Sequence, residues 1–97
     1  MKKGHVYMMT NHKHGTLYVG VTSNLEQRIY QHKTKYFSGF SAKYGLDILI
    51  WFQEYSTIQD AIHEEKRLKG GSRKQKIELI EEINPYWEDL GTSLDSV

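Results

Sequence analysis

Apolar residues alternate with polar ones in two short stretches near the N-terminus. His5–Thr10 and Thr16–Val21 are rich in β-branched and aromatic residues, which favour strands. The segment Asn11–Gly15 between them is polar and ends in glycine, as a hairpin loop does. A third apolar run lies within Asp47–Tyr55 and predicts a central strand. The pattern therefore indicates a hairpin followed, later in the chain, by one more strand.

Three helices are predicted from residues that cap helix N-termini. Each start places a serine or threonine three positions before an acidic or amide residue: Ser23 with Glu26, Thr57 with Asp60, and Ser72 with Gln75. The helices are expected to end near Lys33, Lys69 and Ile83, with Gly70-Gly71 closing the second and Pro85 following the third. The resulting order, β-β-α-β-α-α, predicts an α+β fold in which helices flank a small three-stranded antiparallel sheet.

The length of 97 residues indicates one domain. We expect this domain to span residues 1–90 and residues 91–97 to form a disordered tail. The segment from Lys33 to Gly45 is predicted to be mainly a loop. Its aromatic residues would either stack on bases or, as such clusters more often do, close a small core: Tyr36, Phe37, Phe40 and Tyr44.

Composition excludes several classes of protein. Cysteine is absent, which rules out disulfides and thiolate metal sites. The longest apolar run, Ile48 to Phe52, is far shorter than a membrane helix requires, and the polar start does not resemble a secretory signal. We therefore expect a soluble, cytoplasmic protein that does not enter a membrane.

Charge is unevenly distributed, although the net charge is only +1. No acidic residue interrupts the basic residues between positions 66 and 76, whereas every charged residue from Glu78 onward is acidic. These basic residues either form an ordinary solvated surface or contact phosphates of a nucleic acid: Lys66, Arg67, Lys69, Arg73, Lys74 and Lys76.

Two predicted helices carry charged or polar residues on their apolar faces. At about 100° per residue, Arg28 and His32 fall within roughly 60° of Leu25 on the first helix. Either their stems cover apolar surface, or the face borders a cleft. On the second helix, Glu65 falls near the middle of the apolar face and the adjacent Glu64 falls off its centre. A buried carboxylate requires a partner, which could be Arg28 in an internal salt bridge or a metal ion.

These residues resemble the GIY-YIG nuclease family. Val6-Tyr7 and Tyr18-Val19-Gly20 look like the paired strand motifs that name the family, although His5 stands where the first motif has glycine. Thr22, Leu25, Arg28 and His32 match the pattern that follows, and some members carry a tyrosine in place of His32. Ala61 to Lys69 resembles the family's second conserved helix, in which an alanine precedes the metal-binding glutamate by four positions. The resemblance spans roughly Gly4 to Trp87 and is greatest to stand-alone members, with likeness to the catalytic domain of the excision-repair endonuclease subunit.

The resemblance implies a metal-dependent endonuclease that hydrolyses DNA phosphodiester bonds, in repair or recombination. Glu65 would bind one Mg²⁺ or Mn²⁺ ion, which keeps most of its waters, and Arg28 would neutralise phosphate charge. The family implies that Tyr7 or Tyr18 activates or orients the attacking water, and His32 is an alternative proton acceptor because its unperturbed pKa is about 6.5.

The sequence leaves the roles of two further residues and the substrate open. Lys69 would hold a phosphate or the leaving group. Asn84 either corresponds to a late family asparagine or simply ends the third helix. The alternative function is a non-catalytic nucleic-acid-binding module that retains the fold, and DNA structure, RNA and oligomeric state are undetermined by the sequence. We expect Tyr7, Tyr18, Arg28 and Glu65 to converge on one concave surface, with Glu64 pointing away.

Overall fold

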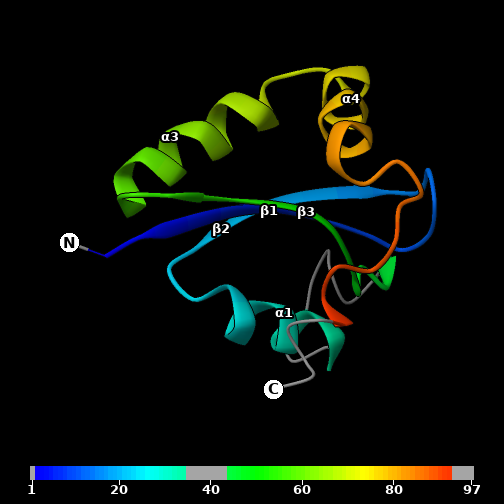
Figure 1. The fold of residues 1–97 in the computed structure, drawn as a ribbon, viewed down its shortest axis with the longest axis horizontal. Helices are drawn as coiled ribbons and strands as arrows, with labels where there is room; N and C mark the ends of the chain where they lie inside the picture. The colour runs from blue at the N-terminus through cyan, green and yellow to red at the C-terminus, as the bar shows by residue number, and fades with distance from the viewer. Residues whose placement is uncertain (1, 35–43, 93–97) are drawn as a thin grey trace.

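A three-stranded antiparallel sheet lies between two layers of helices (Figure 1). The computed structural model describes residues 2–34 and 44–92. Its strands are β1 (Gly4–Thr10), β2 (Leu17–Thr22) and β3 (Ile48–Tyr55), in the order β2-β1-β3. Helix α1 (Leu25–Lys33) covers one face of the sheet, and α3 (Ile58–Lys69) and α4 (Arg73–Ile83) cover the other. The predicted α+β class and element order are confirmed.

Helices α3 and α4 begin at the predicted capping residues, and helix α1 begins one residue later than predicted. The Thr57 hydroxyl accepts a hydrogen bond from the backbone N–H of Asp60, and Ser72 and Gln75 form a complete capping box. The prediction of Ser23 as the first cap was wrong, because Asn24 caps α1 and its side chain accepts from the N–H of Gln27. The Thr22 hydroxyl accepts from the Asn24 N–H at 3.0 Å, which extends the turn after β2 by one residue.

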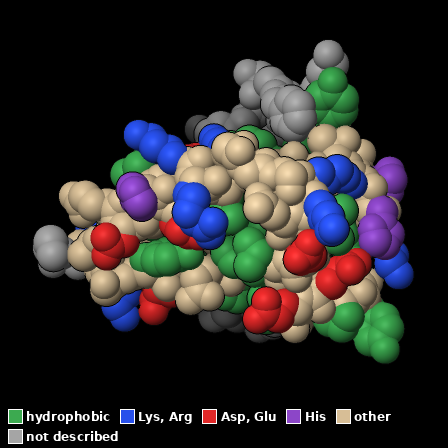
Figure 2. All heavy atoms as spheres, turned by 90° about the horizontal axis from the view of Figure 1, so that it is seen from above, with side chains coloured by type: hydrophobic (Ala, Val, Ile, Leu, Met, Phe, Trp, Pro, Cys, Tyr) green, Lys and Arg blue, Asp and Glu red, His purple; other side chains and the backbone are tan. Residues whose placement is uncertain are grey.

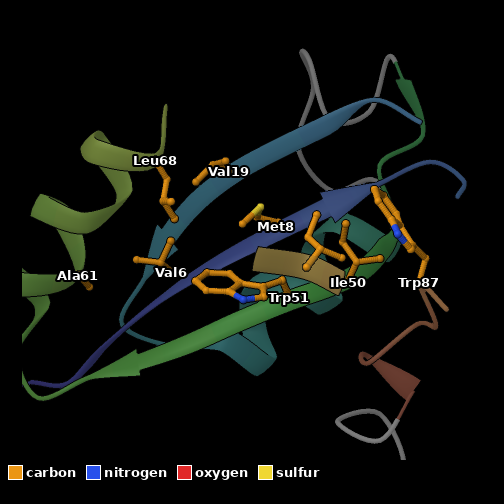
Figure 3. Packing of buried hydrophobic residues seen from close by; sticks show 9 residues of the cluster. Val6, Met8, Val19, Ile50, Trp51, Ala61, Leu68 and Trp87 are labelled. Atoms are coloured by element: carbon orange, nitrogen blue, oxygen red, sulfur yellow. The ribbon is translucent and has the colours of Figure 1, made fainter. Parts of the chain in front are cut away.

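The central strand β1 is buried on both faces, so its side chains divide between two cores. Val6 and Met8 point toward α3 and α4, where they pack with Val19, Ala61 and Leu68 (Figure 3). Tyr7 and Met9 belong to the opposite core, which α1 covers through Leu25 and Ile29. This two-sided burial explains why β1 is almost continuously apolar or aromatic, and why alternate residues of one strand serve different layers.

Two glycines permit close approaches that a larger residue would prevent. A Cβ at Gly4 would lie 2.7 Å from the Cβ of Ala61, so the start of α3 rests directly on β1. Gly20 is the register partner of Tyr7, and a Cβ there would lie 2.4 Å from the Tyr7 hydroxyl oxygen. The Tyr7 ring therefore extends from β1 across Gly20 of the edge strand β2, which explains the glycine within this strand.

The segment after α4 returns to the outer side of β3. The Leu90 N–H donates to the Leu49 carbonyl at 2.7 Å. Asn84 is buried, and its amide nitrogen donates to the carbonyls of Ile50 at 3.0 Å and Glu88 at 2.9 Å. Its amide oxygen accepts from the Glu88 N–H at 3.0 Å. Asn84 thus fastens the end of α4 to β3, in addition to ending the helix.

Some predictions fall at the limits of the described residues. Tyr36, Phe37 and Phe40 lie outside them, and so do residues 93–97 of the expected tail. Gly91, where that tail was expected to begin, is described, and its N–H donates to the Asp89 carboxylate at 2.9 Å. Within residues 2–34 and 44–92, no helix has the length and apolar character that crossing a bilayer requires.

Replacing Asn84 tests its structural role. We expect Asn84→Ala to lower the free energy of unfolding by about 2–3 kcal/mol, because it leaves the buried carbonyl of Ile50 and the partly buried backbone groups of Glu88 without their partner. Denaturant unfolding monitored by circular dichroism measures this loss. Glu82→Ala, at an exposed position of the same helix, is the control and should change stability by less than about 0.5 kcal/mol. Equal stabilities for the two variants would contradict the assignment.

Candidate active site

Three ring side chains meet between β1, β2 and α1. The Tyr7 hydroxyl oxygen lies 3.1 Å from Nε2 of His32. The ring of Tyr18 lies 6.2 Å from that of Tyr7 and 5.4 Å from that of His32, measured between centroids. Strand pairing accounts for this arrangement, because Tyr18 lies two residues before Gly20 on β2 and therefore projects to the same face as Tyr7.

Burial determines the protonation of two of these rings. Tyr7 is fully buried, and its pKa is raised far above its usual range by burial and then by the neighbouring Tyr18, against an opposing effect of Arg28. Burial and then the charge of Arg28 lower the pKa of His32 to about 4. Both rings are therefore uncharged at neutral pH, as suits a buried hydrogen-bonded pair.

Arg28 joins the same group from α1, one helical turn before His32. Its guanidinium hydrogen-bonds to Tyr7 and acts electrostatically on both Tyr7 and His32. Arg28 and Tyr18 are only partly buried, whereas Tyr7 and His32 are buried. The group thus has two members behind the surface and two that reach it, and the structure brings together four of the five residues predicted for catalysis.

The fifth residue, Glu65, lies in the other helical layer. Its side chain is 12% exposed and forms an ion pair with Lys69, with 2.8 Å between Oε2 and Nζ. Ala61 and Leu68 form the buried centre of α3, and at about 100° per residue Glu64 and Glu65 lie on opposite flanks of that centre. The structure therefore does not place Glu65 on the same face of the sheet as Tyr7.

The contacts of Glu64 show which strand each flank of α3 faces. Its carboxylate bonds to Arg67, and, after burial, its charge contributes to raising the pKa of Tyr55 at the end of β3. Glu64 thus leans toward β3, and Glu65, on the other flank, leans toward β2. Glu64 therefore lies on the flank away from Glu65, although its side chain is only 22% exposed.

The oxygen donors at Glu65 fit a hydrated divalent ion. Lys69 pairs with Oε2, and among the described residues Oε1 accepts no hydrogen bond. One carboxylate with water completing the shell suits Mg²⁺ or Mn²⁺ and is too little for zinc. Within residues 2–34 and 44–92, His, Asp and Glu side chains form no group of three or more that could hold a metal ion.

The predicted basic surface is divided by internal contacts. Arg73 donates to the hairpin carbonyls of His14 at 2.8 Å and Gly15 at 2.7 Å, and Lys76 donates to the Gly71 carbonyl at 2.9 Å. Lys66 and Lys74 are exposed. On the α3–α4 face, basic and acidic side chains lie intermixed (Figure 2). Part of the basic segment therefore holds the fold together.

The lowered pKa of His32 predicts a pH dependence of stability. An unfolded histidine has a pKa of about 6.5, so between pH 6.5 and about 4 the unfolded chain binds more protons than the folded one. The free energy of unfolding should therefore fall as pH decreases through this window. Denaturant unfolding at several pH values measures the slope, and His32→Gln should show a shallower one. Equal slopes for both proteins would contradict the buried neutral state.

The comparisons with known proteins agree with this architecture. The family model of the GIY-YIG catalytic domain matches residues 3–78. A UPF0213 protein of Staphylococcus haemolyticus is 35% identical over 86 residues, which cover 84% of this chain and 99% of that protein. A UPF0213 protein of Oceanobacillus iheyensis is 32% identical over 85 residues, covering 84% of this chain and 94% of its own length.

A solved structure also shares the fold. The solution NMR structure of a UPF0213 protein from Bacillus halodurans aligns with a TM-score of 0.56 over 98% of both chains, at 23% sequence identity. Since the family model covers most of the chain and the relatives are small proteins matched over nearly their whole length, the resemblance seen in the sequence is confirmed, and the chain belongs to the GIY-YIG catalytic domain family, the nuclease-type fold.

Proposed function

We propose that this protein is a divalent-metal-dependent endonuclease that hydrolyses phosphodiester bonds of DNA, in repair or recombination. The observation that carries the proposal is the group of Tyr7, Tyr18, Arg28 and His32 on a nuclease-type fold. In the reaction, a water oxygen attacks phosphorus, the bond to one sugar oxygen breaks, and the leaving oxygen gains a proton. The site must therefore neutralise phosphate charge, orient the water and manage a proton.

Arg28 is suited to the phosphate. Its guanidinium stays charged and can bond two phosphate oxygens at once, and the residue is partly exposed. Tyr7 and His32 lie beside Arg28 and are uncharged at neutral pH. Neither of them therefore neutralises the positive charge of its guanidinium. Arg28 would then stabilise the charge that grows on the phosphate in the transition state.

Tyr18 is the hydroxyl best suited to contact the attacking water. It is partly exposed, whereas Tyr7 is fully buried with a raised pKa and His32 has a pKa of about 4, which makes it a weak base. We assign Tyr7 and His32 to positioning: their hydrogen bond would hold Arg28 and Tyr18 at the surface. This replaces the earlier hypothesis that His32 accepts the proton because its pKa is near 6.5.

Glu65 would complete the site from the other side of the β2 edge. A divalent ion held by Glu65 would supply positive charge beside the phosphate and favour deprotonation of the attacking water. Because Glu65 leans toward β2, the strand that also carries Tyr18, we expect a phosphate bound at this edge to be reached from both helical layers. Lys66, Lys69 and Lys74, with any remaining donors of Arg73 and Lys76, would contact flanking phosphates. Asn84 serves the fold, as its contacts indicate.

A cleavage assay with Mg²⁺ or Mn²⁺ over duplex, flap, branched and single-stranded DNA, together with RNA, tests the proposal. We expect Glu65→Gln and Arg28→Ala each to reduce cleavage by ~100-fold or more, because each removes a main stabiliser of the transition state, worth roughly 3 kcal/mol. Circular dichroism checks that the variants are folded.

Glu64→Gln is the matched control and should change the rate little, because Glu64 lies on the β3 flank of α3 and pairs with Arg67. Equally fast cutting by wild type and Glu65→Gln would show that the metal assignment is wrong. If the wild type binds DNA and cuts no substrate of the panel, the protein is a non-catalytic binding module.

A further inference from the structure

The ion pair between Lys69 and Glu65 occupies the carboxylate that the proposed function gives to the metal. Nζ of Lys69 lies 2.8 Å from Oε2 of Glu65, and the two residues are one helical turn apart on α3. The glutamate side chain is 12% exposed and the lysine side chain 52%. A half-exposed ammonium thus covers a carboxylate that is mostly enclosed, and it supplies the charge that burial requires.

Lys69 is also placed to move. It is the last residue of α3, and Gly70-Gly71 follow it. Its ammonium is a compact point charge on a flexible four-carbon stem, and ion pairs between residues one helical turn apart contribute at most about 1 kcal/mol. A divalent cation that binds the same carboxylate would repel this ammonium, because two positive charges a few ångströms apart repel each other strongly.

We infer that Lys69 is the counterion of Glu65 in the metal-free protein, and that metal binding displaces its ammonium toward the phosphate of the substrate. This inference rests on the proposed function. The displaced ammonium remains beside the β2 edge, toward which Glu65 leans, and is free to donate to an anion. Metal and phosphate would then bind with positive coupling, since each favours the state in which Lys69 has left Glu65.

Lys66 provides a matched control. It is a lysine of the same helix, next to Glu65 in the sequence and exposed, and the ion pair that the described residues show for Glu65 is with Lys69. Lys69→Met and Lys66→Met remove the same charge and keep the aliphatic stem. Their difference therefore reports the contact with Glu65 and not the overall charge of α3.

The first test is a calorimetric titration of the protein with Mn²⁺ in the absence of nucleic acid. We expect Lys69→Met to bind Mn²⁺ about 3- to 5-fold more tightly than wild type, as release from a competing pair of up to about 1 kcal/mol implies. Lys66→Met should bind within about 2-fold of wild type. Equal affinities of the two lysine variants would overturn the inference. Unchanged affinity in Glu65→Gln would instead overturn the metal site of the proposed function.

The second test follows the Lys69 ammonium directly by ¹⁵N NMR. Its signal should shift when Mg²⁺ is added to wild type and not when Mg²⁺ is added to Glu65→Gln. Inorganic phosphate should then shift the signal more strongly with Mg²⁺ present than without it. A Lys69 signal that ignores Mg²⁺, while Glu65→Gln has lost Mn²⁺ binding, would overturn the inference and leave the proposed function standing. An equal response to phosphate with and without Mg²⁺ would also overturn it.

Discussion

The buried ring of Tyr7 is the contact on which the candidate site depends. It starts from the central strand, crosses Gly20 of the edge strand and ends 3.1 Å from His32 of α1. Three elements are thereby fixed to one another by a single side chain. Because the ring is fully buried, any displacement would open a cavity or create a clash, each costing on the order of 1–3 kcal/mol. The polar side chains that contact the Tyr7 ring are therefore held in fixed positions as well.

In our proposal the same geometry gives the polar residues different tasks. Tyr7 and His32 lie behind the surface and are held neutral by burial, so they suit orientation better than proton transfer. Arg28 and Tyr18 are only partly buried, and the proposal therefore gives them the contacts with the substrate. Glu65 comes from the opposite helical layer, and its flank of α3 leans toward β2. In our proposal the site lies at the free edge of β2, where both layers can reach one phosphate.

The sequence predicted the fold well because its signals are local. Period-two patterns marked the strands, and Thr57, Ser72 and their partners marked two helix starts. The first start was misplaced because Ser23 and Asn24 are adjacent and both suit a cap. Features set by distant contacts escaped prediction: the pKa of His32 depends on burial, and Arg73 bonds to carbonyls 58 and 59 positions away. Gly20 within β2 was the one sequence feature that could have indicated where the Tyr7 ring lies.

The central claim is that residues from both helical layers meet at one metal-bound phosphate on the β2 edge. Paramagnetic broadening by Mn²⁺ in an NMR spectrum of the protein tests it most directly, with Mg²⁺ as the diamagnetic reference. We expect the signals of Glu65 and Lys69 on α3 and of Tyr18 and Arg28 on the other side to broaden together, and Glu65→Gln to abolish the effect. Broadening confined to α3, or broadening that persists in Glu65→Gln, would contradict the account.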